Sequence, residues 1–505
     1  MNDTVIIPTV GLGFRLGQYT SKINKALLPF GDRPILSHII ELFPNDTHFL
    51  IPVGYLAQQV IDFCTLAYHD RDITFVHVDD WTSKKSGTAY SLLHCKPHIV
   101  GPFWYIPCDT YMDKAPLVPE EDCYFIKTVT GELADRYTTF EVTDDRIDRV
   151  HFKEPIADSM VSAYSGVAFI SKWQEFFERL ENLDGIEFIH IIEAGTLVKE
   201  LPSWLDIGSL DLYENIMLTR QKFDFSKPNE LTYICNDRVI KWWLDESIAK
   251  KKYEKILANL SVYPDNCKYQ NNWLAYDFFP GKTMYQHGDP NSFPNLLSWL
   301  HEKVWIRGDS DISDHSLKFY RDKSISRIDQ FRTSHPDRIL APVVNGVKVD
   351  ESIIDQIDWD LLIDTNLPGL MHGDLQFDNI IIDSAGNFTL IDWRHEFAGL
   401  VDSGDIYYDL AKLAGGLLIN YSLIKQNSFS VRISDDDVII DVPSVEHLER
   451  YQLSLVKYIK DNGLDHRKVQ LLIPIIFLNM SPLHAAPFDL LLWYLGLKML
   501  HETIL

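Results

Sequence analysis

The sequence has few cysteines and no cysteine framework. Six cysteines are spread over 505 residues, without a C-x-x-C pair or a short cluster. No disulfide scaffold is indicated, and the thiols are expected to be reduced and mostly buried, as in a reducing compartment. The cysteines are Cys64, Cys95, Cys108, Cys123, Cys235 and Cys267.

A long hydrophobic run is also missing. The longest, LLIPIIFLNM at 471–480, has about half of the ~20 residues that a membrane-spanning helix needs. The start of the chain, MNDTVIIPTV, has no basic region followed by a long apolar segment, so no signal peptide is indicated. We therefore expect a cytoplasmic protein without membrane insertion.

Positive charge is scarce. The chain has 47 Lys and Arg against 72 Asp and Glu, a formal net charge of −25. Such a surface repels nucleic acid and anionic lipid in general, so neither is an expected partner, although a local cationic pocket for a nucleotide is still allowed. The sequence is rich in apolar residues instead, at 46% with 12% aromatic, which is enough to build buried cores.

The length predicts at least two domains, because a single core stops growing beyond roughly 250–300 residues. In residues 1–222, short apolar runs such as THFLIPVG alternate with segments of helical spacing, which predicts an α/β domain with a doubly wound, mainly parallel sheet. A polar stretch at 223–230 predicts a linker. Strand patterns at about 231–283 then precede helical patterns at about 284–505, which predicts a two-lobed α+β domain.

A glycine-rich loop follows the first apolar run. The segment GLGFRLGQYTSKINK places Gly11 and Gly13 directly after the expected strand, where exposed backbone N–H groups suit a phosphate. Arg15 and Lys25 add two cations. The spacing fits neither the Walker A motif nor the dinucleotide fingerprint, so the glycines alone are equally compatible with a structural turn.

Further elements follow this loop in a fixed order. They are SGTAYSLL at 86–93, PCDTYM at 107–112, FKEP at 152–155, YSGVAFI at 164–170 and WLDIGSLDLYENI at 204–216. With them, residues 4–222 resemble the sugar-phosphate nucleotidylyltransferases, which implies a Rossmann-like nucleotidyltransferase domain. Two positions depart from the family pattern: Asn24 stands where proline is usual, and Phe14 where a small residue is usual, which leaves the base preference open.

The resemblance implies a role for each of these residues. Arg15 and Lys25 would stabilise the charge that grows on the leaving pyrophosphate. Asp109 and Asp206 would hold Mg²⁺, with Mn²⁺ as the alternative. The remaining implied contacts are Gly11, Gly13, Gly87 and Thr88 for the nucleotide and Lys153, Glu154 and Gly166 for the acceptor. Taken singly, each aspartate is equally a turn residue, and Lys153 beside Glu154 a solvated pair.

A second set of polar residues lies far downstream. HGDLQFDN places Asp374 five residues before Asn379, and Asp392 follows in LIDW. This order is typical of protein-kinase-like phosphotransfer, in which the loop aspartate accepts the hydroxyl proton of the acceptor and the other two residues bind Mg²⁺. His372, beside the motif, is expected to be a satisfied loop residue rather than the base.

This part resembles the aminoglycoside phosphotransferase and choline kinase superfamily, with H-G-D in place of the H-R-D of protein kinases. The resemblance implies a protein-kinase-like domain at 231–505. It also implies that Lys241 in RVIKWW contacts the ATP phosphates and that Glu254 orients this lysine, with Glu246 as the second choice. Asp409, in GDIYYDLAKL, is implied to brace the catalytic loop.

The sequence leaves the acceptor open. Arg394, close after Asp392, is the candidate acceptor-binding residue and favours a hydroxylated or anionic substrate. Several aromatic residues leave open a cage for a quaternary ammonium group such as choline, although most tryptophans in a chain of this size belong to the core. These aromatic residues are Trp242, Trp243, Trp393, Tyr407 and Tyr408.

The two resemblances together imply a bifunctional enzyme. ATP would phosphorylate a small sugar or polyol, and an NMP from CTP or UTP would then be joined to that phosphate, giving an NDP-linked precursor for cell-surface glycan such as capsule polysaccharide. One alternative is a choline kinase/phosphocholine cytidylyltransferase that makes CDP-choline from an amino-alcohol acceptor. Another is a nucleotide-sensing scaffold with one inactive domain. A homo-oligomer is compatible with the sequence.

Overall fold

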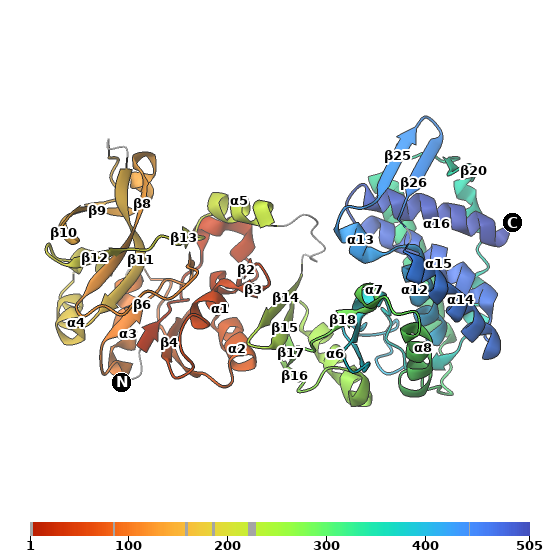
Figure 1. Cartoon of the computed structure of the whole chain (residues 1–505), viewed down its shortest axis with the longest axis horizontal. Coiled ribbons are helices and arrows are strands. Elements are labelled where there is room, and N and C mark those ends of the chain that lie inside the picture. The colour runs from red at the N-terminus through yellow and green to blue at the C-terminus, as the bar shows by residue number, and fades with distance from the viewer. Residues whose placement is uncertain (1–3, 84–85, 157–159, 184–186, 221–228, 444) are drawn as a thin grey trace. The chain divides into compact units, whose positions relative to one another are not determined.

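A computed structural model gives the fold of the chain (Figure 1). It describes residues 4–83, 86–156, 160–183, 187–220, 229–443 and 445–505. The chain divides into two compact units, of which the first comprises Met1–Gln221 and Glu230–Leu244 and the second the remainder. Most of the expected linker, 223–230, lies outside the described residues.

The first unit is built on a nine-stranded sheet within the described residues. Its strand order is β5-β4-β1-β6-β11-β8-β12-β10-β9. The strands are β1 (Thr4–Ile6), β4 (His48–Val53), β5 (Asp72–His77), β6 (Phe103–Tyr105), β8 (Cys123–Thr130), β9 (Thr138–Thr143), β10 (Arg146–Phe152), β11 (Met160–Ile170) and β12 (Leu197–Glu200). The first four in spatial order run parallel to one another. The prediction of a Rossmann-like α/β sheet is confirmed.

The neighbours β1 and β6 position the candidate site. Both are parallel and both are buried, since Val5, Ile6 and Phe103 expose none of their surface. The chain leaves β1 for β4 on one side and reaches β6 on the other, which makes this pair a topological switch point. Ligands of open α/β sheets bind beyond the carboxyl ends of such strands. The Gly11–Gly13 loop and Asp109 follow these two ends.

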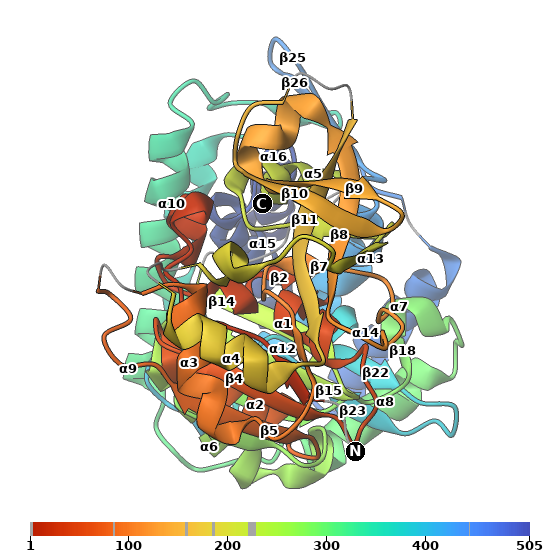
Figure 2. The ribbon, with the colours of Figure 1, turned by 90° about the vertical axis from the view of Figure 1, so that its left-hand side faces the viewer.

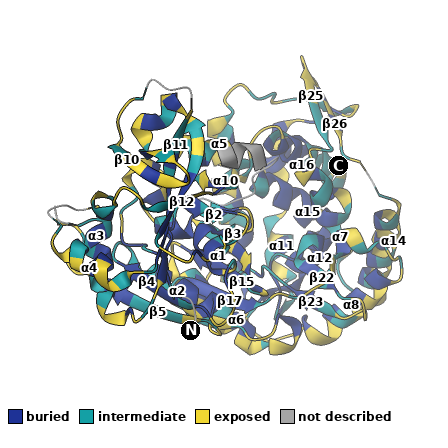
Figure 3. Cartoon of the chain, turned by 60° about the vertical axis from the view of Figure 1, so that its left-hand side comes forward, coloured by how far each residue is buried: buried dark blue, intermediate teal, exposed yellow. Residues whose placement is uncertain are grey.

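Helices and short elements complete the first unit. Figure 2 shows α3 and α4 side by side, and Figure 3 shows β4 as largely buried and α4 as partly exposed. The helices are α1 (Ile35–Ile40), α2 (Ala57–Ala67), α3 (Thr88–Cys95), α4 (Trp173–Glu181) and α5 (Leu210–Arg220). The 3₁₀ turns are η1 (Phe14–Thr20), η2 (Lys25–Leu27), η3 (Lys96–His98), η4 (Gly131–Arg136) and η5 (Phe188–Ile191). Two short ladders pair β2 (Pro29–Phe30) with β3 (Arg33–Pro34) and β7 (Thr110–Tyr111) with β13 (Leu205–Asp206).

The expected start of the kinase-like domain at residue 231 stays a prediction. The hairpin of β14 (Glu230–Cys235) and β15 (Arg238–Trp243) groups with the first unit. Its contacts give the reason. The Tyr233 hydroxyl donates a hydrogen bond to the carbonyl of Leu27, and the Ile234 N–H donates to the carbonyl of Asp32 at 2.7 Å. Such long-range hydrogen bonds leave no periodic pattern in the sequence.

The second unit begins with a helix and small sheets and continues as a large helical part. Its first elements are α6 (Glu246–Ala258), η6 (Leu260–Val262), β16 (Lys268–Gln270), β17 (Trp273–Asp277), β18 (Lys282–Thr283), α7 (Met284–His287) and α8 (Ser292–Lys303). Next come α9 (Ser313–Ser316), the π-helical turn η7 (Leu317–Asp322), α10 (Lys323–Ser334), β19 (Val343–Val344), β20 (Val347–Lys348), η8 (Glu351–Gln356), α11 (Trp359–Asp364), β21 (Pro368–Gly369) and η9 (Phe377–Asn379).

The remaining elements carry the core of the second unit. They are β22 (Ile380–Ile382), β23 (Phe388–Leu390), β24 (Gly404–Asp405), α12 (Ile406–Leu418), α13 (Tyr421–Lys425), β25 (Ser430–Ser434), β26 (Asp437–Asp441), α14 (Glu446–Asp461), α15 (His466–Met480), η10 (Ser481–Leu483) and α16 (Phe488–Ile504). Helices α12 and α15 are buried over most of their length (Figure 3). Their apolar residues extend around the helix, as expected of helices enclosed by others.

The cysteines agree with the expectation of free and mostly buried thiols. All six cysteines are free, and all except Cys267 are buried. Among the described helices, none combines the length and the apolar character that a crossing of the bilayer requires.

A fully buried ion pair in the second unit gives a stability prediction. The Lys468 ammonium lies 2.8 Å from Asp405 Oδ2, with both side chains fully buried. Replacing Lys468→Met leaves the Asp405 charge without its cation, so the free energy of unfolding should fall by about 3–5 kcal/mol. The measurement is urea unfolding followed by tryptophan fluorescence.

The matched control is Lys498→Met. Lys498 makes a partly exposed i,i+4 pair with Glu502 at 3.5 Å, and its loss should change the free energy of unfolding by less than about 1 kcal/mol. Equal decreases in the free energy of unfolding in the two variants would show that the buried pair contributes no more to stability than the exposed pair.

Candidate active sites

The glycine loop of the first unit is shaped around Lys25. Gly13 has φ +68°, and a Cβ atom placed on it would lie 2.9 Å from Thr20 Cγ2 and 3.2 Å from Lys25 Cβ. A larger residue at this position would therefore be strained and would press on the lysine. A Cβ atom on Gly11 would meet nothing within 4 Å, and Gly11 is exposed. The loop thus presents open backbone beside the lysine.

Asn24 fixes the turn that carries Lys25. Its side chain is buried, donates to the carbonyls of Thr9 at 2.9 Å and Tyr55 at 2.6 Å, and accepts from the N–H of Ala26 at 2.9 Å. It acts as the N-cap of η2. The Asn24 amide therefore ties the turn to the segment that follows β1.

Asp109 receives two cations. The Lys25 ammonium donates to Asp109 Oδ2 at 3.1 Å, and the Arg15 guanidinium lies 4.0 Å from the same oxygen. Lys25 and Asp109 are largely buried, whereas the Arg15 side chain is 64% exposed. Arg15 is therefore free to turn toward a ligand, while Lys25 is fixed against the carboxylate.

A short ladder brings Asp206 to Asp109. Asp206 pairs with Thr110 in the β13–β7 ladder, and the Ile207 N–H donates to the Asp109 carbonyl at 3.0 Å. A Cβ atom placed on Gly208 would lie 2.7 Å from Asp109 Oδ2 and 3.0 Å from both Asp206 Oδ1 and Arg15 Nη2. The two carboxylates and the guanidinium therefore converge on one point that only glycine leaves free.

The two carboxylates differ in their titration. Burial acts to raise the pKa of Asp109, but the Lys25 ammonium and then the Arg15 guanidinium together hold this pKa below its usual value. Burial and then the Asp109 charge raise the pKa of Asp206. The Tyr137 hydroxyl donates to Asp206 Oδ2 at 3.1 Å, and the Gly208 N–H donates to Oδ1 at 2.8 Å. The ionised form of Asp109 is thus favoured by its neighbours. The ionised form of Asp206 would be stabilised by a nearby cation.

The other predicted residues of the first unit lie around this centre or along β10 and α3. Gly166 sits at an irregularity of β11 with φ +89°, and a Cβ atom there would lie 2.6 Å from Pro107 Cγ. Thr88 donates to Glu187 Oε2 at 2.7 Å, and Gly87 precedes it as the N-cap of α3. Lys153 and Glu154 are exposed just beyond the end of β10.

The catalytic loop of the second unit is braced by Asp409. This aspartate is fully buried on α12 and accepts the N–H groups of His372 and Gly373, each at 2.7 Å. His372 is equally buried, its Nε2 faces the Ile391 carbonyl at 2.8 Å, and burial lowers its pKa to about 3. His372 is therefore a neutral structural residue, as predicted, and Asp374 is the group that points out of the loop.

The expected metal residues lie on adjacent ends of one hairpin. Asn379 ends η9 and donates from Nδ2 to the Asp374 carbonyl at 2.8 Å, and its own carbonyl accepts from the Ile391 N–H at 2.9 Å. Asp392, the next residue, has φ +57°. The register of β22 and β23 therefore places Asn379 and Asp392 at the same end of the hairpin, with Asp374 tied to it.

Lys412 lies in the second candidate site, and the motif did not reveal it. Its ammonium lies 2.8 Å from Asp374 Oδ1, with 6% of the lysine side chain exposed against 35% of the aspartate. Burial acts to raise the pKa of Asp374, but Lys412 and then Arg394 hold it far below its usual value. A signal existed in the sequence, because Lys412 follows Asp409 by three residues and so shares its helix face.

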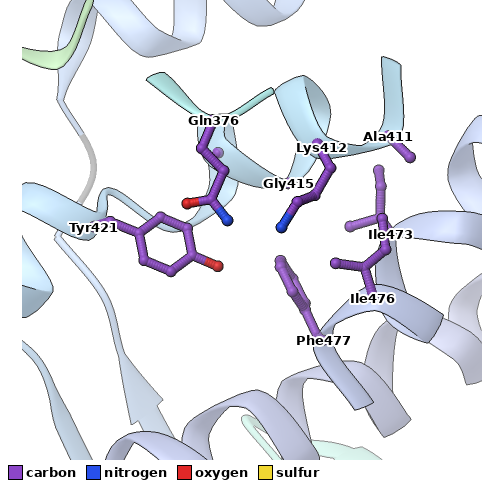
Figure 4. A pocket seen from close by; sticks show the side chains of 9 residues that line it. Gln376, Ala411, Lys412, Gly415, Tyr421, Ile473, Ile476 and Phe477 are labelled. Carbon is purple, nitrogen blue, oxygen red and sulfur yellow. The ribbon is translucent and has the colours of Figure 1, made fainter. Parts of the chain in front are cut away.

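Figure 4 shows the space next to this pair, where Lys412, Gln376 and Tyr421 point toward one another. The cavity has a volume of about 10 Å³ and is walled by Ile473, Ile476 and Phe477 on the far side. That volume is enough for a single water molecule. The cavity is therefore too small for a sugar or polyol.

The aromatic residues considered for a cage are buried, in line with the expectation that most belong to the core. Trp393 is 1% exposed, its Nε1–H donates to the Lys252 carbonyl at 3.0 Å, and the Lys252 ammonium lies 5.6 Å from the centroid of its ring. The other four aromatic residues are each less than 10% exposed and belong to the cores, namely Trp242, Trp243, Tyr407 and Tyr408.

Lys241 and Glu254 belong to different units. Lys241 is buried on β15, and its ammonium lies 4.0 Å from Glu230 Oε1 in the same hairpin. Glu254 is half exposed on α6 and lies 3.9 Å from the Lys250 ammonium. Glu246 accepts from the Tyr269 hydroxyl at 3.2 Å. The pairing of Lys241 with Glu254 stays a prediction.

Both sites suit a hard divalent cation that retains water. Among the described residues, no three or more His, Cys, Asp or Glu side chains gather as a metal cage. Each site instead offers two oxygen-bearing side chains, Asp109 with Asp206 and Asn379 with Asp392. Mg²⁺ is usually held in this way, by one or two protein ligands together with phosphates and water.

Comparisons with known proteins follow this division. Residues 311–432 match the model of the phosphotransferase enzyme family, APH. The N-terminal part is similar to nucleotidyltransferases. Separate parts of the chain are thus similar to two different kinds of protein. Both resemblances predicted from the motifs are therefore confirmed.

Two curated relatives match part of the chain. The bifunctional protein GlmU of Methanococcus vannielii is 28% identical over 190 residues, which are 36% of this chain and 43% of the relative. The 2-C-methyl-D-erythritol 4-phosphate cytidylyltransferase of Syntrophotalea carbinolica is 51% identical over 54 residues, which are 10% of this chain and 22% of the relative. The chain thus spans less than half the length of these relatives.

Two solved structures align with about two fifths of the chain. UDP-glucose pyrophosphorylase complexed with UDP-glucose is 16% identical, covers 43% of this chain and 98% of its own, and has a TM-score of 0.37. The CTP:phosphocholine cytidylyltransferase of Streptococcus pneumoniae is 20% identical, covers 43% of this chain and 99% of its own, and has a TM-score of 0.35.

Gly208 provides a test of the first site. In Gly208→Ala the new Cβ atom would overlap Asp109 Oδ2 and Asp206 Oδ1 and force the carboxylates apart. Because a misplacement of about 1 Å costs roughly 100-fold in rate, nucleotidyl transfer should fall by at least about that factor. Pyrophosphate release from NTP and a sugar phosphate is the measurement.

Gly101→Ala is the matched control, since a Cβ atom there meets nothing within 4 Å. Its rate should equal that of the wild type. Full activity in Gly208→Ala would disprove the convergence of the carboxylates on this glycine.

Proposed function

We propose that the two units catalyse consecutive steps. The second unit transfers the γ-phosphoryl group of ATP to a hydroxyl of a small sugar or polyol. The first unit then joins that phosphate to an NMP from CTP or UTP, giving an NDP-linked precursor for cell-surface glycan and releasing pyrophosphate. The observation that carries the proposal is that each unit by itself holds an aspartate against a largely buried lysine, at 3.1 Å for Lys25 and Asp109 and 2.8 Å for Lys412 and Asp374.

In the phosphotransfer step, Asp374 accepts the proton of the attacking hydroxyl. Its low pKa makes it a weak base, so it acts mainly by orienting the hydroxyl and takes the proton as the bond to phosphorus forms. Asp409 holds the loop in place through the N–H groups of His372 and Gly373. We assign Lys241 to the ATP phosphates and Glu254 to the orientation of that lysine.

In the nucleotidyl step, a phosphate oxygen of the acceptor attacks the α-phosphorus of the NTP. Arg15 and Lys25 stabilise the charge that develops on the leaving pyrophosphate, and Lys153 with Glu154 and Gly166 binds the acceptor. Gly11, Gly13, Gly87 and Thr88 bind the nucleotide. When bound, Mg²⁺ at Asp109 and Asp206, and at Asn379 and Asp392, supplies charge neutralisation at the phosphates.

A choline kinase/phosphocholine cytidylyltransferase ranks second. The buried state of Trp393 counts against an aromatic cage at this residue, and Arg394, which donates to the Gly373 carbonyl at 2.9 Å, disfavours a cationic acceptor. A scaffold with one inactive domain ranks third, because both predicted sets of reactive side chains are present and both include carboxylates close to lysines.

The two steps should be separable by mutation. Asp374→Asn should abolish phosphorylation, yet leave nucleotidylation of a pre-phosphorylated acceptor within about twofold. Asp109→Asn should do the reverse. Each loss should reach at least about 1,000-fold, since the base or a metal ligand is removed. ADP and pyrophosphate are measured separately, with a panel of sugars, polyols, sugar acids and choline as acceptors.

Circular dichroism of each variant establishes that it is folded. If either substitution eliminated both reactions in a folded chain, the two-site proposal would be wrong. ATP turnover without a nucleotidylated product would leave a kinase alone.

The Lys412–Asp374 pair predicts a pH effect. In the wild type Asp374 stays ionised, so kcat/KM for phosphotransfer should be flat on the acid side to about pH 5. In Lys412→Met burial dominates and raises the pKa of Asp374, so the rate should fall at low pH and recover as pH rises through the new pKa. The measurement is the pH profile of kcat/KM.

Lys425→Met is the control, because Lys425 makes an exposed pair with Asp378 at 2.7 Å and does not contact Asp374 in the structure. Its profile should match that of the wild type. An unchanged acid limb in Lys412→Met would mean that the lysine does not set the titration of Asp374.

A further inference from the structure

Two cations share one pair of aromatic rings in the second unit. The Lys323 ammonium lies 3.3 Å from the centroid of the Phe319 ring and 5.8 Å from that of Tyr408. The Arg394 guanidinium lies 5.2 Å and 5.8 Å from the same two centroids. The two like charges therefore lie against the same rings and repel each other. The cation–π attraction to the rings offsets only part of this repulsion.

Two further cations extend this group. Lys412 is paired with Asp374, and Arg327, one turn beyond Lys323 on α10, donates to the Asn479 carbonyl at 3.1 Å. Burial and then Arg394, Arg327 and Lys412 lower the pKa of Lys323 well below its usual value. These four residues, Lys323, Arg327, Arg394 and Lys412, form what we call the basic cluster.

The basic cluster has too few carboxylates to balance it. Asp374 is the carboxylate paired with it, through Lys412. The neighbouring Asp405 is bound to Lys468 at 2.8 Å, and Asp409 is bound to backbone N–H groups. Among the described residues, no carboxylate lies within 4.0 Å of the Lys323 ammonium. Burying positive charges without neighbouring anions costs free energy. A ligand with an anionic group would reduce this cost.

The position of the cluster points to the acceptor rather than to ATP. Lys323 and Arg327 lie on α10 and Lys412 on α12, whereas the expected metal residues Asn379 and Asp392 lie at the β22–β23 hairpin. Lys323 follows directly on the π-helical turn η7, which carries Phe319. Turns of this kind occur often at functional sites.

We propose that the acceptor carries a carboxylate or phosphate group in addition to the hydroxyl that is phosphorylated, and that the basic cluster binds this anion beside Asp374. The inference rests on the proposed phosphotransfer function and narrows its substrate to acidic sugars or polyols. Phe319 and Tyr408 keep the cations in place and exclude water from them. The same charges repel a quaternary ammonium acceptor.

The test compares matched pairs of acceptors on the full chain. D-gluconate is paired with D-sorbitol, and glycerol 3-phosphate with glycerol, so that each pair differs in its anionic group; choline is the cationic probe. Binding is measured first without ATP, by ligand-observed NMR. The acidic member of at least one pair should bind about 10- to 100-fold more tightly than its neutral partner, as charge-assisted hydrogen bonds require. Which pair shows the gain distinguishes carboxylate from phosphate.

Variants of Lys323 locate the anion. Lys323→Met should lose this preference, and Lys323→Arg should retain most of it. Lys318→Met, an exposed lysine on the same π-helical turn, is the matched control and should behave as the wild type. Equal binding of acidic and neutral members, binding of neither, or an unchanged preference in Lys323→Met overturns the proposal.

ADP release then separates this proposal from the function on which it rests. The expected result is that Lys323→Met raises KM for the acidic acceptor and leaves KM for ATP unchanged. A rise in KM for ATP instead would assign the cluster to the nucleotide and overturn the proposal. Anion binding that depends on Lys323, without ADP formation from any acceptor, would support the anion site and count against the phosphotransfer function.

Discussion

Each candidate site depends on a lysine held against a carboxylate. The distance is 3.1 Å between Lys25 and Asp109 and 2.8 Å between Lys412 and Asp374. A carboxylate drawn out of water would otherwise take up a proton and lose its use for metal binding or for orienting a hydroxyl. The lysine keeps the charge in place before any substrate arrives. Both reactions handle phosphate oxygens, so the same lysines are also cations near the incoming negative charge.

The placement of these lysines explains why the surrounding elements are shaped as they are. Asn24 caps the turn that carries Lys25 and ties it to the segment that follows β1. Helix α12 arranges the second site, because Asp405, Asp409 and Lys412 follow one another at spacings of four and three residues and so share one face. Asp405 anchors the helix, Asp409 holds the catalytic loop, and Lys412 reaches the catalytic aspartate. One face of α12 thus carries the three side chains that make these contacts.

Local patterns allowed much of this to be predicted. The strands β1, β4, β5 and β6 are short apolar runs, and the glycine loop and Asp109 follow their ends as expected. The role of Gly208 could not be read in the same way, because it comes from the pairing of β13 with β7, almost a hundred positions away. The hairpin of residues 230–243 reads locally as the start of the second domain, and its hydrogen bonds to Leu27 and Asp32, which group it with the first unit, leave no local pattern. The basic cluster joins α10, α12 and Arg394, which no single motif contains.

The basic cluster stands out because the chain as a whole has a net charge of −25. An acidic surface offers no long-range attraction to an anionic substrate, and at physiological salt such fields are screened beyond about 8 Å. Selection of an anion must then come from contacts at short range, in a place from which water is partly removed. The rings of Phe319 and Tyr408 provide that place, since they cover one side of Lys323 and Arg394 without neutralising them. A carboxylate in the position of either ring would have neutralised the positive charge of the basic cluster. The aromatic faces do not neutralise it, so the charge is available to a ligand.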